Sequence, residues 1–160
     1  MALTTHVASS VGWLGAVAVF LVLGVVAMTS ADTETVRAVY RVAEPAAWFA
    51  LVPLALASLV TGLIQSLCTT WGLFQHYWVL FKLAMNVGAV AVLLMYMKTL
   101  DYLARVAATT EPTGHDLIVL RTPSVALHSF LALLLLLTAT VLAVHKPRGL
   151  TPYGARRRHG

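Results

Sequence analysis

The sequence predicts an all-α protein, a bundle of four transmembrane helices with both termini on the same side of the membrane. Of its 160 residues, 59% are hydrophobic and only 11% are charged, whereas soluble domains carry about 25% charged residues. The charged residues cluster and leave neutral runs at 1–31, 45–81 and 122–144. The first and last runs each fit one spanning helix of about 20 residues, and the middle run fits one helix, a turn and the start of the next.

The first span is expected at about residues 7–28. The leading residues, MALTTH, lack the positively charged region of a signal peptide, and the apolar run that follows is longer than that of a signal peptide. A helix that is retained in the protein is therefore predicted. Polar and small residues recur at the three-to-four spacing of one helix face. This face is expected to look inward, and it carries His6, Ser9, Ser10, Trp13, Val17, Phe20 and Gly24.

The second and fourth spans are expected at about residues 46–66 and 123–144. On the second, one face carries Ser58, Thr61, Gly62 and Gln65, and Pro53 is expected to kink the helix because it removes one backbone hydrogen bond. On the fourth, Ser124 and His128 lie one turn apart, ahead of a leucine-rich stretch at 131–137 that is expected to face lipid.

The third span, at about residues 77–97, contains a lysine. Only fifteen residues separate Lys82 from Lys98, so a spanning helix must reach back to Tyr77 and take Lys82 into the membrane or its rim. A charge there is costly and marks a functional site by default. Two interpretations stay open: an inward role beside Trp78 and Asn86 on the same face, or a side chain that reaches back to the headgroups.

The predicted organisation is a single transmembrane domain at residues 1–150 followed by a basic tail at 151–160. The side of the membrane that holds both termini is called side A, and it is expected to be cytoplasmic. The tail residues Arg156, Arg157 and Arg158 are expected to touch anionic lipid rather than nucleic acid. Side B holds all six acidic residues and an expected loop at 98–121 that could dock another protein. The single cysteine allows no intramolecular disulfide.

Six histidines in a short membrane chain suggest a metal or haem ligand, since imidazole commonly binds both. His6, His76 and His145 are expected near side A, whereas His128 lies near side B. The axial distance from His6 to His128 is roughly 20 Å, so these two cannot bind the same iron. His6 and His76 remain a possible metal-ligand pair. In the alternative interpretation they are interfacial side chains, with His76 in an aromatic belt beside Tyr77 and Trp78.

Several motifs resemble a known group of membrane proteins. In order along residues 1–97, they are His6-x6-Trp13-x-Gly15, Thr61-Gly62, Trp71-Gly72 and Lys82. The set resembles the membrane domain of the copper-resistance protein D (CopD) family and four-span predicted integral membrane proteins of actinobacteria. More distantly it is similar to HemJ, a haem-binding protoporphyrinogen oxidase.

The resemblance implies a location in a bacterial plasma membrane and a role for two residues, His6 as a first-helix ligand and Lys82 as the functional lysine of the third helix. If a cofactor binds, the face of Trp13 is expected to line its pocket, and Asn86, on the same face as Lys82, is expected to contact it. The haem-binding relatives place the glycine one residue later after the tryptophan and carry another histidine at the end of the first helix, where this chain has Gly24 to Met28.

Three functions therefore stay open, and the sequence does not decide whether the protein is an enzyme. The first is a haem-binding (haem b) or redox site near side A. The second is copper handling through His6 and His76, with methionines as further ligands. The third is a structural accessory subunit that packs with another membrane protein or a second copy of the chain. No Rossmann, P-loop, zinc-protease or serine-hydrolase motif is present in the sequence.

Overall fold

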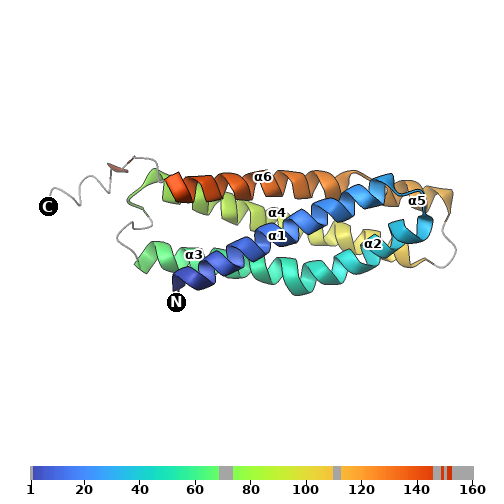
Figure 1. The fold of residues 1–160 in the computed structure, drawn as a ribbon, viewed down its shortest axis with the longest axis horizontal. Helices are drawn as coiled ribbons and strands as arrows, with labels where there is room; N and C mark the ends of the chain where they lie inside the picture. The colour runs from blue at the N-terminus through green and yellow to red at the C-terminus, as the bar shows by residue number, and fades with distance from the viewer. Residues whose placement is uncertain (1, 69–73, 110–112, 146–148, 150, 153–160) are drawn as a thin grey trace.

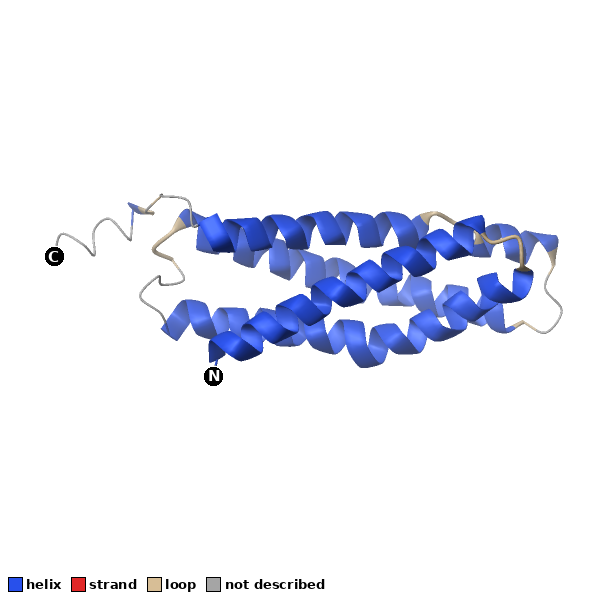
Figure 2. Cartoon of the chain, in the orientation of Figure 1, coloured by secondary structure: helices blue, strands red, loops and turns tan. Residues whose placement is uncertain are grey.

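The computed structural model describes residues 2–68, 74–109, 113–145, 149, 151 and 152, and its regular elements there are all helices (Figure 2). In chain order they are α1 (Ala2–Thr29), α2 (Thr33–Ala46), the π-helical segment η1 (Ala47–Leu51), α3 (Val52–Cys68), α4 (Tyr77–Ala108), α5 (Gly114–Leu120) and α6 (Ser124–His145).

The helices form four rods, and all four are long and apolar enough to cross a membrane. They cover Leu3–Thr29, Thr33–Cys68, Tyr77–Ala108 and Gly114–His145. The expectation of an all-helical protein with four such helices is therefore confirmed. Within an apolar 18-residue stretch of each rod, only 17% to 28% of the residues are buried inside the bundle. A narrow stripe of each rod thus faces the bundle interior, and the remaining apolar surface suits a lipid environment.

Neighbouring rods run antiparallel (Figure 1). Helix α1 packs against α6 on one side and against the continuous α2–η1–α3 rod on the other, and α4 packs against the same two neighbours. Helices α1 and α4 therefore lie diagonally across the bundle. One end holds the start of α1, the end of α3, the start of α4 and the end of α6, and is called the His6 end (Figure 1). The opposite end is called the Arg37 end.

The predicted loop at 98–121 is wrong. Helix α4 continues to Ala108, and α5 covers most of the remainder. Similarly, the second rod begins at Thr33, thirteen residues before the predicted span. Charged residues mark where the apolar stretch ends, but a helix carries its own backbone hydrogen bonds and can extend beyond that point into water.

The second rod widens into η1 where the sequence predicts a kink. Pro53 has no N–H to donate to the carbonyl of Phe49, four residues earlier, and the π-helical segment lies just before it. The disturbance is therefore absorbed as a wider turn. It leaves Phe49 with 85% of its surface exposed, on the outside of the bundle.

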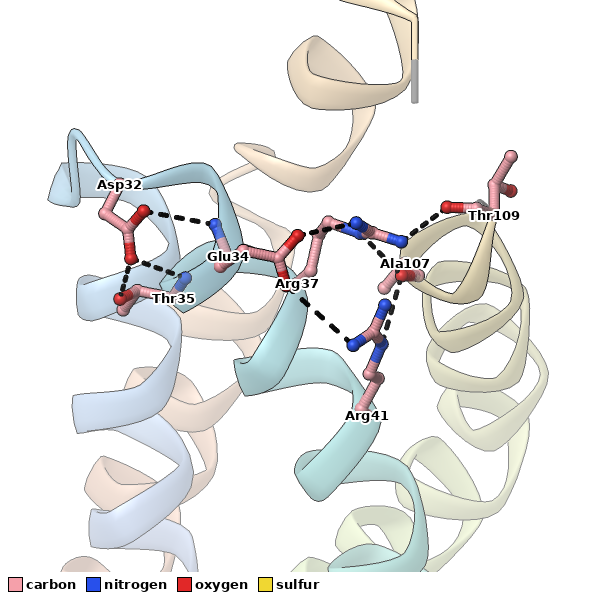
Figure 3. A network of polar contacts seen from close by, with 7 residues as sticks. All are labelled: Asp32, Glu34, Thr35, Arg37, Arg41, Ala107 and Thr109. Carbon is pink, nitrogen blue, oxygen red and sulfur yellow. Dashed lines mark hydrogen bonds and ion pairs between the residues drawn. The ribbon is translucent and has the colours of Figure 1, made fainter. Parts of the chain in front are cut away.

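At the Arg37 end, two arginines of α2 cap the C-terminus of α4 (Figure 3). The Arg37 side chain, only 9% exposed, donates from Nε to the Ala107 carbonyl (2.9 Å), from Nη1 to Glu34 Oε1 (2.6 Å) and from Nη2 to the Thr109 carbonyl. Arg41 also donates to the Ala107 carbonyl, at 3.2 Å. These contacts satisfy carbonyls that a helix end leaves without partners and place positive charge at its negative end.

At the His6 end, a short segment after α6 pairs with the approach to α4. The Thr151 N–H donates to the Gln75 carbonyl (2.9 Å), its hydroxyl donates to the Phe74 carbonyl (2.5 Å), and the Tyr77 N–H donates to the Gly149 carbonyl (3.3 Å). The start of α4 is thereby tied to the chain that follows α6.

Candidate functional site

The candidate site is a group of polar side chains inside the bundle at the His6 end, called the polar seam. Its members come from three helices and are His6, Ser9 and Ser10 of α1, Ser58 and Thr61 of α3, and Lys82 and Asn86 of α4. Four of the seven are at least 93% buried: His6, Ser9, Ser58 and Asn86. Polar groups buried in an apolar bundle need partners within the protein or from a ligand.

One hydrogen bond sets the protonation pattern of His6. Its Nδ1 lies 3.1 Å from the Thr61 hydroxyl, and that hydroxyl lies 2.5 Å from the Ala57 carbonyl. A carbonyl only accepts, so the single Thr61 proton goes to Ala57 and the Thr61 oxygen accepts from Nδ1–H of His6. In the neutral ring this assigns the lone pair to Nε2.

Gly62 gives the imidazole its space. A Cβ atom built on Gly62 would lie 2.9 Å from Cε1 of His6 and 3.5 Å from its Nδ1. Real Cβ atoms essentially never come so close, so a glycine here lets the ring lie directly on the backbone of α3. Close approach of this kind through small residues is typical of helix contacts in membranes.

Two more contacts fix the α1 side of the seam. The hydroxyls of Ser10 and Ser58 lie 2.8 Å apart and join α1 to α3, while the Ser9 hydroxyl donates to the His6 carbonyl at 3.1 Å. Trp13, expected to line a cofactor pocket, is buried in the hydrophobic core. It thus lies on the inward face of α1, as its spacing from His6 predicts.

Lys82 and Asn86 contribute to the seam from the opposite corner of the bundle. Lys82 is half-buried and lies in the second turn of α4, as His6 does in α1, the diagonal helix. Asn86 lies one turn further along the same face and is 93% buried. Among the described residues, neither side chain makes a hydrogen bond or an ion pair. His6, Lys82 and Asn86 thus lie at the same end of the bundle.

His76 lies at the His6 end of the bundle, where α4 begins. It is the N-cap residue of α4, is buried, and its ring centroid lies 6.4 Å from that of Trp78. Where the chain is described, no group of three or more His, Cys, Asp and Glu side chains could hold a metal ion. The expected pair of His6 and His76 thus gains no third protein ligand of these types there.

The other histidines of the described residues, His115, His128 and His145, are not part of the polar seam. His128 stacks on Tyr96 of α4, with ring centroids 4.4 Å apart, and its Nδ1 donates to the Ser124 carbonyl. Similarly, His145 donates from Nδ1 to the Val141 carbonyl. Both, together with His115, are exposed. The Ser124 hydroxyl accepts from Tyr96 rather than bonding His128.

The sequence analysis placed Thr61 and Gly62 on one face but gave neither a role toward His6. A signal was present: a hydroxyl and a glycine lie side by side on α3 near the side A end, at the expected depth of His6. Helical spacing does not say which two faces meet, so the contact required the packed bundle.

Comparisons with models of protein families, with curated proteins and with solved structures find no match. The fold and the seam define a class of protein: an all-helical bundle with four helices fit to cross a membrane and a buried polar site at one end. Four such apolar rods suggest an integral membrane protein in contact with the lipid bilayer.

Proposed function

We propose that this protein binds haem b at the His6 end of the bundle, where His6 would hold the iron. The observation that carries the proposal is the Thr61 hydroxyl, which holds Nδ1–H of His6 and so leaves the Nε2 lone pair available. Ligating histidines almost always donate their other ring N–H to a protein acceptor, which fixes the tautomer and the ring orientation.

The residues of the seam fit such a ligand. His6 Nε2 would hold the iron, Thr61 and Gly62 would orient the ring, and Trp13 would supply an apolar wall. Lys82 and Asn86 are polar groups at the same end of the bundle that make no hydrogen bond or ion pair with the described part of the chain. Haem, when bound, supplies one-electron chemistry whose potential depends on axial ligands and burial. A redox role is therefore the activity that this proposal implies.

The proposal includes an arrangement in the membrane. The His6 end would lie at side A, together with both termini, and side A would be the cytoplasmic face of a bacterial plasma membrane. The contact of Arg156, Arg157 and Arg158 with anionic lipid is part of this arrangement, although these arginines lie outside the described residues.

A structural role is the second candidate, and one observation favours it. The pairs His6–Thr61 and Ser10–Ser58 are both direct bonds between α1 and α3. Polar pairs of this kind hold membrane helices together without any ligand. Under this alternative the chain would be an accessory subunit or would assemble with copies of itself. For copper binding, the described residues offer no group of three or more His, Cys, Asp and Glu side chains that would support it.

Haem titration into the purified apoprotein distinguishes the two candidates. The wild-type protein should develop a Soret band that saturates at one haem per protein molecule. His6→Ala should lose the band, and added imidazole should restore part of it. His115→Ala, which removes an exposed histidine outside the seam, should behave as wild type. A wild-type protein that gives no saturable band would leave the structural role as the better account.

A further inference from the structure

His128 carries an imidazole nitrogen that stays available on the outer surface of the bundle. Its Nδ1 lies 2.8 Å from the Ser124 carbonyl, which only accepts, so Nδ1–H donates and the lone pair of the neutral ring lies on Nε2. The side chain is exposed, and Nε2 makes no hydrogen bond with the described residues. This nitrogen is therefore an acceptor that a ligand from outside the chain can reach.

Tyr96 and Ser124 hold the imidazole in position. The Tyr96 ring of α4 stacks on it, with ring centroids 4.4 Å apart and an interplanar angle of 29°. The Tyr96 hydroxyl donates to the Ser124 hydroxyl at 3.0 Å, so Ser124 binds both rings, His128 through its carbonyl and Tyr96 through its side chain. Nε2 thus keeps one direction, and preorganisation of this kind lowers the entropy cost of binding a ligand.

The surface around His128 is apolar and begins close to where the charged residues end. Three exposed apolar side chains of α6 flank it, Leu127, Phe130 and Leu131. His128 lies four residues, or about 6 Å of helix, past the start of α6, and Lys98 follows Tyr96 by only two residues. In a bilayer this depth is just inside the hydrocarbon boundary, where an unpaired acceptor is costly. The partner of Nε2 must therefore be a donor group that dissolves in the lipid phase.

The geometry points to a binding site for a lipid-soluble hydroquinone, in which Nε2 of His128 accepts a hydrogen bond from a phenolic O–H and Tyr96 holds the imidazole in position. Glycerophospholipids carry their O–H and N–H donors in the headgroup layer, outside this depth. A hydroquinone carries its donors on an apolar ring, and that ring and its tail would lie against the exposed side chains of α6. The site needs neither iron nor His6, so it goes beyond the proposed haem binding.

The test uses two ligands that differ in their hydroxyl groups alone. Decylhydroquinone and its dimethyl ether share the ring and the tail, but the ether has no O–H to donate. Calorimetric titration of the full-length, haem-free protein in neutral detergent, without oxygen, should show saturable binding of the hydroquinone that is at least about tenfold tighter than that of the ether. His128→Phe keeps an aromatic ring without the acceptor and should abolish the difference.

His145 supplies the matched control. It is also exposed and bonds a backbone carbonyl of α6 through Nδ1, but no ring of the described residues stacks on it. His145→Phe should therefore preserve the tenfold difference. Tyr96→Leu, which removes the stacked ring, should weaken hydroquinone binding, and Tyr96→Phe, which keeps a ring, should weaken it less.

Nitrogen NMR of ¹⁵N-histidine-labelled wild-type protein gives a readout that needs no variant. The hydroquinone should shift the Nε2 resonance of His128 and leave that of His145 unchanged, and 1-decanol, an aliphatic alcohol with the same tail, should not displace it. Equal binding of hydroquinone and ether, a difference that survives in folded His128→Phe, or displacement by equimolar 1-decanol would overturn the proposal. A hydroquinone-dependent shift in a protein that develops no Soret band with haem would support this site and contradict only the haem proposal.

Discussion

At the scale of single residues, the account depends on one threonine hydroxyl. Thr61 gives its proton to the carbonyl of Ala57 in its own helix and accepts from His6. A hydroxyl that bonds back along its helix is common, but here it leaves the oxygen as an acceptor in the seam. The tautomer of the His6 imidazole is thus determined by α3, through the Thr61 hydroxyl and the Ala57 carbonyl to which it donates.

This assignment predicts the neutral tautomer of His6 directly. Nitrogen NMR of ¹⁵N-histidine-labelled protein, at a pH where the ring is neutral, should show a protonated Nδ1 and an unprotonated Nε2 for His6. Thr61→Val should shift the population toward the Nε2–H form, while Thr61→Ser should preserve the wild-type pattern. If wild-type His6 proves to be protonated at Nε2, the ligand role assigned to that nitrogen fails. In haem titrations, Thr61→Val should weaken binding about 10- to 100-fold.

Gly62 and Gly15 form a matched pair for testing the packing of the imidazole. Gly62→Ala places a Cβ 2.9 Å from His6 Cε1, so the ring must move, at a cost of about 1–3 kcal/mol in unfolding free energy. Gly15→Ala has nothing within 4 Å of the new Cβ and should be neutral or slightly stabilising. Thermal unfolding in detergent measures both. Equal melting temperatures for the two variants would contradict the close contact.

At the scale of helices, the charged residues near the Arg37 end act as caps. Arg37 and Arg41 bond the last carbonyls of α4, and Arg121 donates to the Ser30 carbonyl at the end of α1. Asp32 caps the start of α2. The sequence analysis used these residues only to place the membrane boundary. Their role could not be predicted because it depends on which helix ends meet.

Removing the Arg37 cap should destabilise the protein. Arg37→Met removes a donor from the buried carbonyl of Ala107 and another from the carbonyl of Thr109, and we expect a loss of about 2 kcal/mol or more. Arg105→Met removes an arginine whose side chain is 71% exposed and forms an ion pair with Asp101, and it should cost less than about 1 kcal/mol. Unfolding in detergent, followed by circular dichroism, compares the two. A smaller effect for Arg37→Met than for Arg105→Met would contradict the capping role.

The Asp32 cap predicts a pH dependence. The Thr35 hydroxyl, followed by the backbone N–H groups of Thr35 and Glu34, donates to the carboxylate and lowers the pKa of Asp32. The unfolded chain lacks these bonds, so the ionised form favours folding. The stabilisation is complete above the ordinary pKa of Asp, about 4, and is lost as pH falls through the lowered value.

Melting curves between neutral and acidic pH test this. Asp32→Asn keeps a capping oxygen but does not titrate, so it should lose less stability than wild type on acidification. Asp101→Asn removes a charge from a surface ion pair and serves as the control. An unchanged acid dependence in Asp32→Asn would show that Asp32 does not contribute.

At the scale of the whole molecule, the number of rods could be predicted because the neutral runs and the length of a spanning helix fix it together. The inward faces of α1 and α4 could also be predicted, since His6, Trp13 and Asn86 follow helical spacing and are buried. How far the helices extend beyond the apolar runs could not be predicted, because hydropathy locates the part of a helix that can lie in the membrane and not the ends of the helix itself. The contacts of Thr61 and Gly62 with His6 could not be predicted either, since they depend on how α1 and α3 pack.

The absorption spectrum tests the central proposal most directly. It is measured for the oxidised and the reduced forms of wild-type protein and of His6→Ala, each purified from cells supplied with haem. The account predicts a Soret band in wild type that shifts on reduction, and its loss in a His6→Ala protein that still folds by circular dichroism. A folded wild-type protein without the band, or a His6→Ala variant that keeps it unchanged, would contradict the role assigned to His6.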